Sequence, residues 1–348
     1  MTELIPSAGD VPPLIVAEIS GNHNGSLERA LEIVRAVAAS GAGAVKIQTY
    51  TADTITLDVD TPAFRVSDGH ELWGSRTLYD LYTEAHTPYE WHEEIFGLAR
   101  ELGLIAFSTP FDESAVDFLE GLDAPLYKVA SLEIVDLPLI RRIAETGKPV
   151  IMSVGTATIG EVAAAVEAAR DGGAEDLTLL ACTSSYPARA EDAHLRRMAT
   201  MRDMFGVKVG LSDHTLGIGV SVAAATLGAR VIEKHVTLRR SDGGVDAAFS
   251  LEPEELRALV DESAAAVAAL GSAAAWSTAA ETESLRLRPS LYVAADVRAG
   301  DEVTLDNVRS VRPSGGLAPV HLPAVLGRRF TADASVGTPV SWELLSAG

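Results

Sequence analysis

Short apolar runs alternate with helix-like segments along most of the chain. From residue 14 to about residue 270, each run of apolar or β-branched residues is followed by a segment in which apolar residues recur at helical spacing. The predicted strands are 14–19, 44–49, 105–108, 126–129, 149–153, 177–181, 207–211 and 231–235. The predicted helices are 27–40, 88–102, 113–120, 138–146, 159–171, 193–204, 218–227 and 253–270. Eight such units are typical of an α/β protein with a (β/α)8 TIM barrel, whereas a doubly wound sheet rarely needs so many.

The pattern changes near residue 271. Small residues dominate the next stretch, and beyond it short strand-like runs at 290–294, 308–312, 328–330 and 339–341 are separated by turns rich in glycine and proline. We therefore expect a catalytic barrel domain over residues 1–271, a linker over 272–285 and a small β-rich domain over 286–348.

Amino-acid composition limits the classes of binding partner that the chain can have. The chain has 348 residues, and 28 lysines and arginines against 49 aspartates and glutamates give a net charge of −21, which disfavours nucleic acid and anionic membranes as partners. A local basic pocket for a small anion remains compatible with this charge. A single cysteine, Cys182, precludes an intramolecular disulfide, and we interpret it as a small buried residue. Neither a signal peptide nor a long apolar run is evident, so we expect a cytoplasmic protein.

Polar residues collect where the predicted strands end. Because the carboxyl ends of parallel barrel strands meet at one rim, we expect these side chains to converge there. They are Glu18, Lys46, Gln48, Thr109, Lys128, Ser131, Glu133, Ser153, Ser184, Tyr186, Ser212, His214, Glu233 and His235. The long loop 50–86, which carries Trp73 and Tyr82, is expected to overhang the same rim.

Lys46 and Lys128 lie inside apolar strands, where an unpaired lysine is costly. They are either paired with barrel carboxylates or part of an anion site. Two ammonium groups beside a ring of hydroxyls favour the second interpretation, because this is the set of donors that a phosphate needs.

His214 and His235 end two adjacent strands. A histidine in such a place is often only a hydrogen-bonded structural residue. Two of them in a carboxylate-rich rim indicate a divalent ion that acts as a Lewis acid, since two protein ligands leave positions open for water and substrate. Asp246 follows on a glycine-containing loop that either is a plain turn or brings its carboxylate over the rim. We expect His70, His92, His194 and His321 at the surface.

Six motifs resemble those of the sialic acid synthase family, whose enzymes condense phosphoenolpyruvate with an amino sugar to make nonulosonic acids. They are AEISGNHNG at 17–25, VKIQTY at 45–50, FSTPF at 107–111, YKVAS at 127–131, GLSDHT at 210–215 and IEKH at 232–235. Residues 286–348 are similar to the family's antifreeze-like (SAF) domain. Within the family, segments 78–89 and 240–253 resemble the pseudaminic acid synthases, with Ala247 where sialic and legionaminic acid synthases typically have histidine.

The resemblance implies a role for each matching residue. Phosphoenolpyruvate would be held by Lys46, Thr109, Lys128, Ser131, Ser153, Ser184 and Ser212. The metal, Mn²⁺ with Mg²⁺ or Co²⁺ as alternatives, would bind His214 and His235. Glu18, Gln48, Tyr186 and Asp246 would face the sugar, and Glu18 would handle the proton of the attacking water, with Glu133 and Glu233 as alternatives. Arg312 would reach the sugar's N-acyl group from the other subunit of a domain-swapped homodimer.

The implied reaction joins phosphoenolpyruvate to a 2,4-diacetamido-2,4,6-trideoxy hexose (6-deoxy-AltdiNAc), giving pseudaminic acid and phosphate by C–O cleavage. The alternatives within the family are an N-acetylneuraminate or legionaminate synthase, or a related nonulosonate synthase for a surface or spore polysaccharide. A metal-dependent hydrolase is a different class, but it has less use for paired strand lysines. A non-catalytic sugar-binding protein leaves the polar rim unexplained.

Overall fold

The computed structural model describes residues 4–7, 11–66, 74 and 76–347. His70 and Trp73 lie outside the described residues. The chain divides into two compact units, Met1–Leu270 and Gly271–Gly348. Among the residues that the structure describes, no helix is both long enough and apolar enough to cross a membrane.

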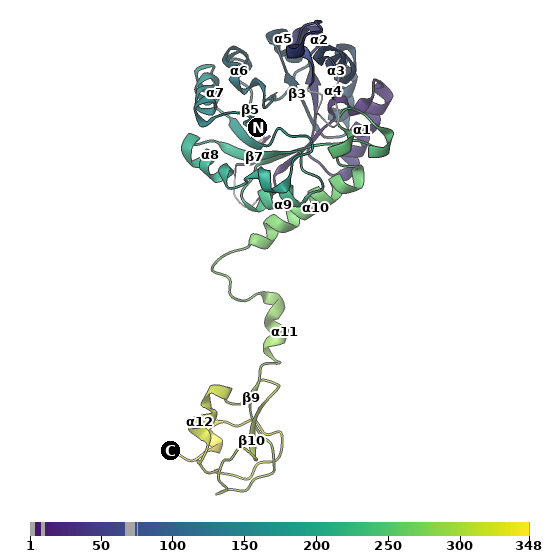
Figure 1. Cartoon of the computed structure of the whole chain (residues 1–348). Helices are drawn as coiled ribbons and strands as arrows, with labels where there is room; N and C mark the ends of the chain where they lie inside the picture. The colour runs from purple at the N-terminus through teal and green to yellow at the C-terminus, as the bar shows by residue number, and fades with distance from the viewer. Residues whose placement is uncertain (1–3, 8–10, 67–73, 75, 348) are drawn as a thin grey trace. The chain divides into compact units, whose positions relative to one another are not determined.

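The first unit is a closed barrel of parallel strands that pair in chain order, with β8 returning to β1 (Figure 1). The strands are β1 (Leu14–Glu18), β2 (Ala44–Thr49), β3 (Ile105–Pro110), β4 (Tyr127–Val129), β5 (Val150–Ser153), β6 (Leu177–Cys182), β7 (Lys208–Asp213) and β8 (Val231–His235). The expected TIM barrel is therefore confirmed, and each predicted strand is present to within two residues at either end.

Helices cover the outside of the barrel. They are α1 (Leu27–Ser40), α4 (His92–Glu101), α5 (Glu113–Gly121), α6 (Leu137–Ala144), α7 (Ile159–Asp171), α8 (Arg197–Phe205), α9 (Gly219–Thr226) and α10 (Pro253–Leu270). Their apolar faces pack on the outer faces of the strands in one large core. Helix α8 begins four residues later than predicted, because Ala190–Ala193 forms a 3-10 helix and His194 then adopts a left-handed backbone with φ of 44°.

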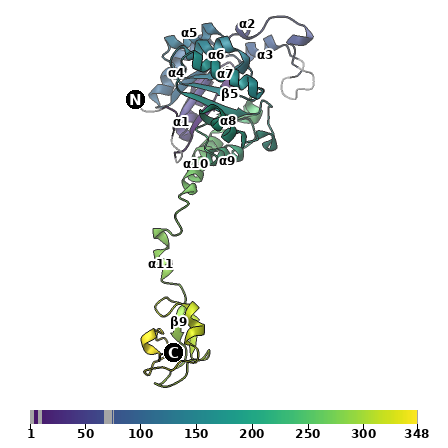
Figure 2. The same ribbon diagram turned by 90° about the vertical axis from the view of Figure 1, so that its left-hand side faces the viewer.

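The loop after β2 carries two additional helices, α2 (Ala52–Ile55) and α3 (Leu78–Ala85), which pack against each other (Figure 2). Thr77 caps α3 by accepting a hydrogen bond from the Asp80 amide. Tyr82 of α3 meets Tyr50 edge to face, with ring centroids 5.7 Å apart, and Tyr50 meets Phe111 in the same way at 5.1 Å. The loop is thereby fixed beside the carboxyl ends of β2 and β3.

The interior of the barrel has two layers that follow from the alternation of side chains along a strand. An apolar layer closes the amino-terminal half, and Ile5 from the chain's start is buried within it. Its other members are Val16, Ala44, Phe107, Leu126, Ile151, Leu180 and Val231. Two residues further along the same strands the inward side chains become polar, and they include Glu18, Lys46, Thr109, Lys128, Ser153 and Glu233. The site therefore rests on a dry apolar base.

The second unit contains an antiparallel pair, β9 (Ser290–Val293) and β10 (Val308–Val311), in which Val293 pairs with Val308. Further chain crossings are isolated bridges, such as Glu302 with Arg329, so the strand predicted at 328–330 is not an extended one. Short helices α11 (Thr282–Leu285) and α12 (Leu322–Val325) complete this unit, and a small apolar core lies inside it. Every residue from 271 to 289 is exposed, whereas the precise limits of a linker at 272–285 stay a prediction.

Candidate active site

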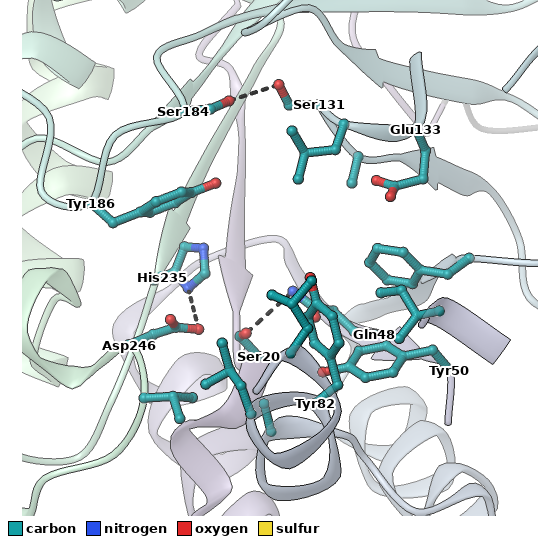
Figure 3. Close-up of a pocket in the computed structure, with 18 of the residues that line it drawn as sticks. Ser20, Gln48, Tyr50, Tyr82, Ser131, Glu133, Ser184, Tyr186, His235 and Asp246 are labelled. Carbon is teal, nitrogen blue, oxygen red and sulfur yellow. Dashed lines mark hydrogen bonds and ion pairs between the residues drawn. The ribbon is translucent and has the colours of Figure 1, made fainter. Parts of the chain in front are cut away.

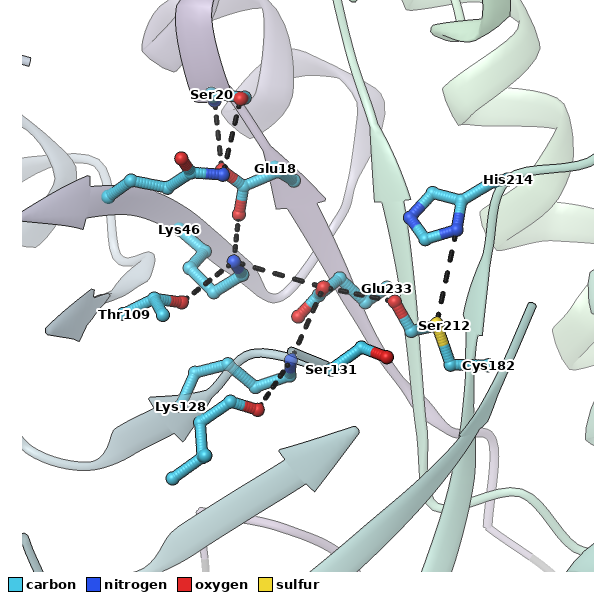
Figure 4. Close-up of polar contacts among 12 residues, drawn as sticks. Glu18, Ser20, Lys46, Thr109, Lys128, Ser131, Cys182, Ser212, His214 and Glu233 are labelled. Atoms are coloured by element: carbon cyan, nitrogen blue, oxygen red, sulfur yellow. Dashed lines mark hydrogen bonds and ion pairs between the residues drawn. The ribbon is translucent and has the colours of Figure 1, made fainter. Parts of the chain in front are cut away.

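The centre of the polar layer is a cluster of opposite charges (Figure 4). Lys46 Nζ contacts the Glu18 carboxylate, lies 3.8 Å from Glu233 Oε1 and donates a hydrogen bond to Thr109 Oγ1 over 3.1 Å. Burial opposes the charge of Lys46, but the neighbouring carboxylates outweigh this effect and raise its pKa. Lys46 is therefore a permanent cation at the rim.

Lys128 approaches the same carboxylate from the other side. Its Nζ lies 3.8 Å from Glu233 Oε1 and donates to the Val129 carbonyl over 3.1 Å. Burial lowers the Lys128 pKa, and the positive charge of Lys46 adds to this effect. Burial alone would raise the pKa of Glu233, but the two ammonium groups outweigh it and lower that pKa. The structure thus confirms that the lysines are paired with barrel carboxylates. The anion site stays a prediction.

Several polar atoms of this cluster are left without partners. Glu233 Oε1 accepts from Ser212 Oγ over 3.2 Å, whereas its Oε2 and the Ser153 hydroxyl are buried and have no hydrogen-bond partner among the described residues. Buried polar groups are almost always paired, so these atoms are candidates for hydrogen bonds to a bound ligand.

Ser131 and Ser184 place two more hydroxyls at the rim, 2.7 Å apart. Gly155 follows β5, and a Cβ atom at this position would overlap both hydroxyls. The glycine therefore keeps open a small cradle bounded by hydroxyl groups. Such a cradle beside two ammonium groups matches the donors that a phosphate group requires.

His214 and His235 lie side by side, with ring centroids 5.4 Å apart. His214 Nδ1 lies 3.0 Å from the Thr183 carbonyl, which can only accept, so Nδ1 carries the proton and Nε2 keeps its lone pair. His235 Nδ1 lies 3.4 Å from Asp246 Oδ2. The rings of Tyr186 and Phe249 pack against the pair, at 4.5 Å from His214 and 5.0 Å from His235 respectively.

A cavity of about 380 Å³ opens above these groups (Figure 3). Its polar lining residues are Ser20, Gln48, Ser131, Glu133, Ser184, Tyr186, His235 and Asp246. Apolar side chains also line it, among them Ile55, Val66, Leu78, Leu81, Phe111, Leu132 and Val245. Gln48 Nε2 donates to Ser20 Oγ over 3.2 Å, which links two of the polar lining residues.

The loop that carries Asp246 is tied to the loop after β1. Asn22 Nδ2 donates to Ser250 Oγ and to the Val236 carbonyl, each over 2.8 Å, and Arg29 forms an ion pair with Asp242 at 2.8 Å. Burial would raise the pKa of Asp246, but its contact with His235 outweighs that effect and lowers the pKa. The Asn22 side chain thus holds the Asp246 loop in place, a role that the sequence left open.

The predicted rim residues of the barrel do come together, with two differences from expectation. Glu18 is occupied by Lys46 and by the Ser20 amide, which donates to Glu18 Oε1 over 2.9 Å. Asp246 faces His235 as well as the cavity. Arg312 belongs to the second unit, where it is exposed.

Sequence reasoning missed three features of the molecule. The Thr183 carbonyl beside His214 carries no side-chain signal. Lys234, between Glu233 and His235, is fully buried in an ion pair with Asp213. The prediction that His92 lies at the surface is wrong: it is completely buried, and its ring nitrogens contact Thr49 Oγ1 at 2.8 Å and the Pro88 carbonyl at 3.0 Å.

Comparison with known proteins identifies the family. The model of the NeuB family matches residues 33–275, and that of the SAF domain matches residues 288–346. The chain belongs to the NeuB family. It is 42% identical over 331 residues to the pseudaminic acid synthase of Helicobacter pylori, covering 95% of this chain and 97% of the relative. It is 35% identical over 348 residues to the N,N'-diacetyllegionaminic acid synthase of Legionella pneumophila, covering 98% and 97%.

A solved relative shares the fold. The N-acetylneuraminic acid (sialic acid) synthetase of Leptospira borgpetersenii, crystallised with citrate, superimposes with a TM-score of 0.70 at 29% identity, covering 81% of this chain and 95% of that one. The family resemblance seen in the six motifs is thus confirmed, and so is the SAF domain at the carboxyl end.

Proposed function

We propose that this member of the NeuB family condenses phosphoenolpyruvate with a 2,4-diacetamido-2,4,6-trideoxy hexose to give pseudaminic acid and phosphate. The observation that carries the proposal is the convergence of a lysine–carboxylate cluster, a hydroxyl cradle and two imidazoles at one rim of the barrel. The cradle hydroxyls of Ser131 and Ser184 and the ring of His235 also line the cavity, whereas the lysines and His214 are not among its lining residues. The 42% identity to pseudaminic acid synthases over nearly the whole chain supports this choice of product.

Phosphoenolpyruvate would lie across the lysine cluster. Lys46 and Lys128 are shared with the carboxylates of Glu18 and Glu233, so the cluster has little net charge. Binding of the anion would therefore depend on directed hydrogen bonds as well as charge. Ser131, Ser153 and Ser184, with Thr109 and Ser212, would supply those hydrogen bonds.

A divalent metal fits beside this cluster. The described residues contain no group of three or more histidine, cysteine or acidic side chains arranged to hold a metal. The fit instead rests on two imidazoles: the Thr183 carbonyl accepts from His214 Nδ1, and the Asp246 carboxylate lies 3.4 Å from His235 Nδ1, so Nε2 of each ring would serve as the metal ligand. A metal bound there, Mn²⁺ by our proposal, would supply Lewis acidity toward the sugar's aldehyde oxygen.

The reaction requires carbon–carbon bond formation followed by hydration. C3 of phosphoenolpyruvate attacks C1 of the open-chain sugar, water adds at C2, and the C2–O bond to phosphate breaks. Lys46 and Lys128 would hold the carboxylate and phosphate groups of phosphoenolpyruvate while these bonds form and break. The cavity would keep the two reacting carbons close together, which supplies the entropic part of the rate enhancement.

The geometry favours Glu133 for handling the water's proton. Glu18 and Glu233 are held by lysines, whereas Glu133 lines the cavity, and its Oε2 has no hydrogen-bond partner among the described residues. Burial raises the pKa of Glu133, which brings this carboxyl closer to the pH at which a general acid or base works best. We therefore propose Glu133, rather than Glu18, as the residue that handles the proton of the attacking water.

The apolar lining residues of the cavity suit the proposed sugar. A trideoxy sugar with two acetamido groups presents three methyl groups, and side chains such as Leu78, Leu81 and Val245 offer apolar surface for them. A sugar with a hydroxyl at C6 would lose about 1–3 kcal/mol if that group met one of these apolar side chains without a hydrogen-bond partner. The Arg312 contact from a second subunit, the domain-swapped dimer and the cytoplasmic location stay predictions.

The test is a panel of amino sugars incubated with phosphoenolpyruvate and Mn²⁺, with phosphate release measured and products identified by mass and NMR. We expect the 6-deoxy-AltdiNAc sugar to give the highest kcat/KM. A preference for the legionaminate precursor, or for N-acetylmannosamine, would instead assign the chain to the legionaminate or the N-acetylneuraminate synthases, and a preference for another amino sugar would assign it to a related nonulosonate synthase. Phosphate release without any sugar would indicate a hydrolase.

A further inference from the structure

The outer faces of β7 and β8 carry a buried ion pair that the proposed reaction does not use. Asp213 Oδ2 and Lys234 Nζ lie 3.2 Å apart, and their side chains are 1% and 0% exposed. Because side chains alternate along a strand, both point away from the inner layer that holds His214 and His235. The two residues also face each other in the β7–β8 register.

Asp213 and Lys234 together enclose the segment that carries His214. Asp213 Oδ1 accepts hydrogen bonds from the Thr215 amide at 2.9 Å and from the Thr215 hydroxyl at 2.8 Å. Lys234 Nζ donates to the Thr215 carbonyl over 2.5 Å. A three-residue turn is thus held at both ends, and His214 is its middle residue.

The same contacts connect this turn to its surroundings. Ser221 Oγ, on α9, donates to Asp213 Oδ2 over 2.6 Å, so the turn is anchored to the helix behind it. Lys234 directly precedes His235 on β8. Lys234 therefore connects the two imidazoles: its ammonium group contacts the turn that carries His214, and His235 is the next residue along its strand.

We propose that Asp213 and Lys234 form a positioning pair that sets the spacing of the His214 and His235 rings and thereby the affinity for a divalent metal. This inference rests on the metal site of the proposed function. Net stability does not explain the pair, because a buried ion pair is often no more stabilising than apolar residues of similar size. Geometry does explain it, since Asp213 and Lys234 both hold Thr215, the residue directly after His214.

The experiment compares Mn²⁺ binding by calorimetry in three variants of the full chain. Lys234→Met removes the ammonium group and leaves Asp213 as an unpaired buried charge, so it should lower the melting temperature as well as the affinity. The double variant Asp213→Asn with Lys234→Met leaves no buried charge and should recover much of the melting temperature. Its Mn²⁺ affinity should nevertheless stay about 10–100-fold below that of the unaltered chain, as for other changes next to metal ligands.

Lys208→Met is the matched control. Lys208 is the first residue of β7, the strand that ends at Asp213, and so lies at the opposite end of the barrel. It pairs with Asp176 at 3.1 Å and donates to the Ile5 carbonyl at 2.8 Å. Its loss should lower stability without changing Mn²⁺ affinity. If the double variant binds Mn²⁺ as tightly as the unaltered chain, the pair is only structural and the inference is wrong.

A second measurement separates this inference from the proposed function. Should the unaltered chain bind no Mn²⁺, the metal assignment fails, and the pair is then judged by the histidine ring signals of the metal-free protein in ¹⁵N NMR. Lys234→Met should change the His214 Nδ1 signal, because the turn beside the Thr183 carbonyl is released. The Lys208→Met variant should leave that signal in place, and an unchanged signal in Lys234→Met would contradict the positioning role.

Discussion

The barrel rim carries two buried ion clusters, one facing the interior on β1, β2, β4 and β8 and one on the outer faces of β7 and β8. On the inner face, Glu233 Oε2 and the Ser153 hydroxyl have no hydrogen-bond partner among the described residues. On the outer face, both oxygens of Asp213 accept hydrogen bonds and Lys234 has two acceptors. Because a buried polar atom is rarely left unpaired without a reason, the inner cluster is open for a ligand and the outer one is complete in itself. Changes in the inner cluster, or in the imidazoles beside it, should therefore alter the chemistry, whereas changes in the outer cluster should alter stability and the geometry around His214.

The largest expected effect comes from the imidazole pair above the inner cluster. His235→Ala removes one of the two proposed metal ligands, and turnover should fall by at least about a thousandfold because the Lewis acid is lost. The measurement is phosphate release at saturating substrates and Mn²⁺. His194→Asn is the control, since His194 is exposed and asparagine tolerates its left-handed backbone. Near-normal turnover of His235→Ala in metal-free buffer would contradict the proposed role.

Glu233→Gln tests the inner cluster directly. The substitution leaves Lys46 and Lys128 without their shared counter-charge, so the chain should lose roughly 3 kcal/mol of stability. The net charge of the cluster also rises by one, so KM for phosphoenolpyruvate should fall while kcat drops, by about a hundredfold on the scale of other electrostatic groups in active sites. Steady-state kinetics and urea unfolding measure both effects.

The matched control for that variant is Glu120→Gln. Glu120 pairs with Lys148 at 2.5 Å and accepts from the Tyr127 hydroxyl at 2.6 Å, outside the inner layer. We expect Glu120→Gln to lower the free energy of unfolding and to leave KM for phosphoenolpyruvate unchanged. An unchanged KM for phosphoenolpyruvate in Glu233→Gln as well would remove the distinction between the two faces.

Arg312→Ala should have a smaller and more selective effect. If Arg312 of a second subunit contacts the sugar's acyl group, its removal should raise KM for the sugar about tenfold, the loss expected for one charge-assisted hydrogen bond, and leave KM for phosphoenolpyruvate nearly unchanged. Arg309→Ala, also exposed in the second unit, is the control. Equal increases for both substrates would argue against contact with the acyl group.

The sequence was sufficient to predict which charged residues lie in the barrel interior, but not which of them form ion pairs with one another. Alternation along the strands predicts that Lys46, Lys128 and Glu233 share the barrel interior, and the structure brings them within ion-pair distance. Whether a strand lysine meets a carboxylate or a free anion depends on side-chain rotamers that no periodicity reports. For the same reason the sequence named Glu133 only as an alternative to Glu18, since the burial of its carboxyl and its unpaired oxygen are visible only in the structure.

Backbone partners were equally invisible to the sequence. The Thr183 carbonyl fixes the His214 tautomer, yet any residue at position 183 would present one. His92 was misplaced because its α4 helix begins at His92 after a 3-10 turn at Tyr89–Trp91, which rotates the ring onto β2. Such local changes in helix geometry leave no clear pattern in the amino-acid order.

His92 gives the smallest expected effect on activity, because its effect is confined to stability. Burial lowers its pKa to about 4, despite backbone contacts that act in the opposite direction. The unfolded chain binds the proton near pH 6.5 and the folded chain only near pH 4, so stability is lost as the pH falls through this window. In His92→Gln this loss should be smaller by up to about 3 kcal/mol. Urea unfolding at pH 7 and pH 4.5 measures it, and an unchanged pH dependence would contradict the neutral buried state.

The most direct test of the account uses phosphoenolpyruvate labelled with ¹⁸O in the bridge between carbon and phosphorus. The chain is incubated with this substrate, the 6-deoxy-AltdiNAc sugar and Mn²⁺, and the label is followed by mass spectrometry. If the inner cluster and the imidazoles form one site for both substrates, the label should leave in the phosphate, and only when the sugar is present. Label retained in the organic product, or phosphate released without sugar, would contradict the account.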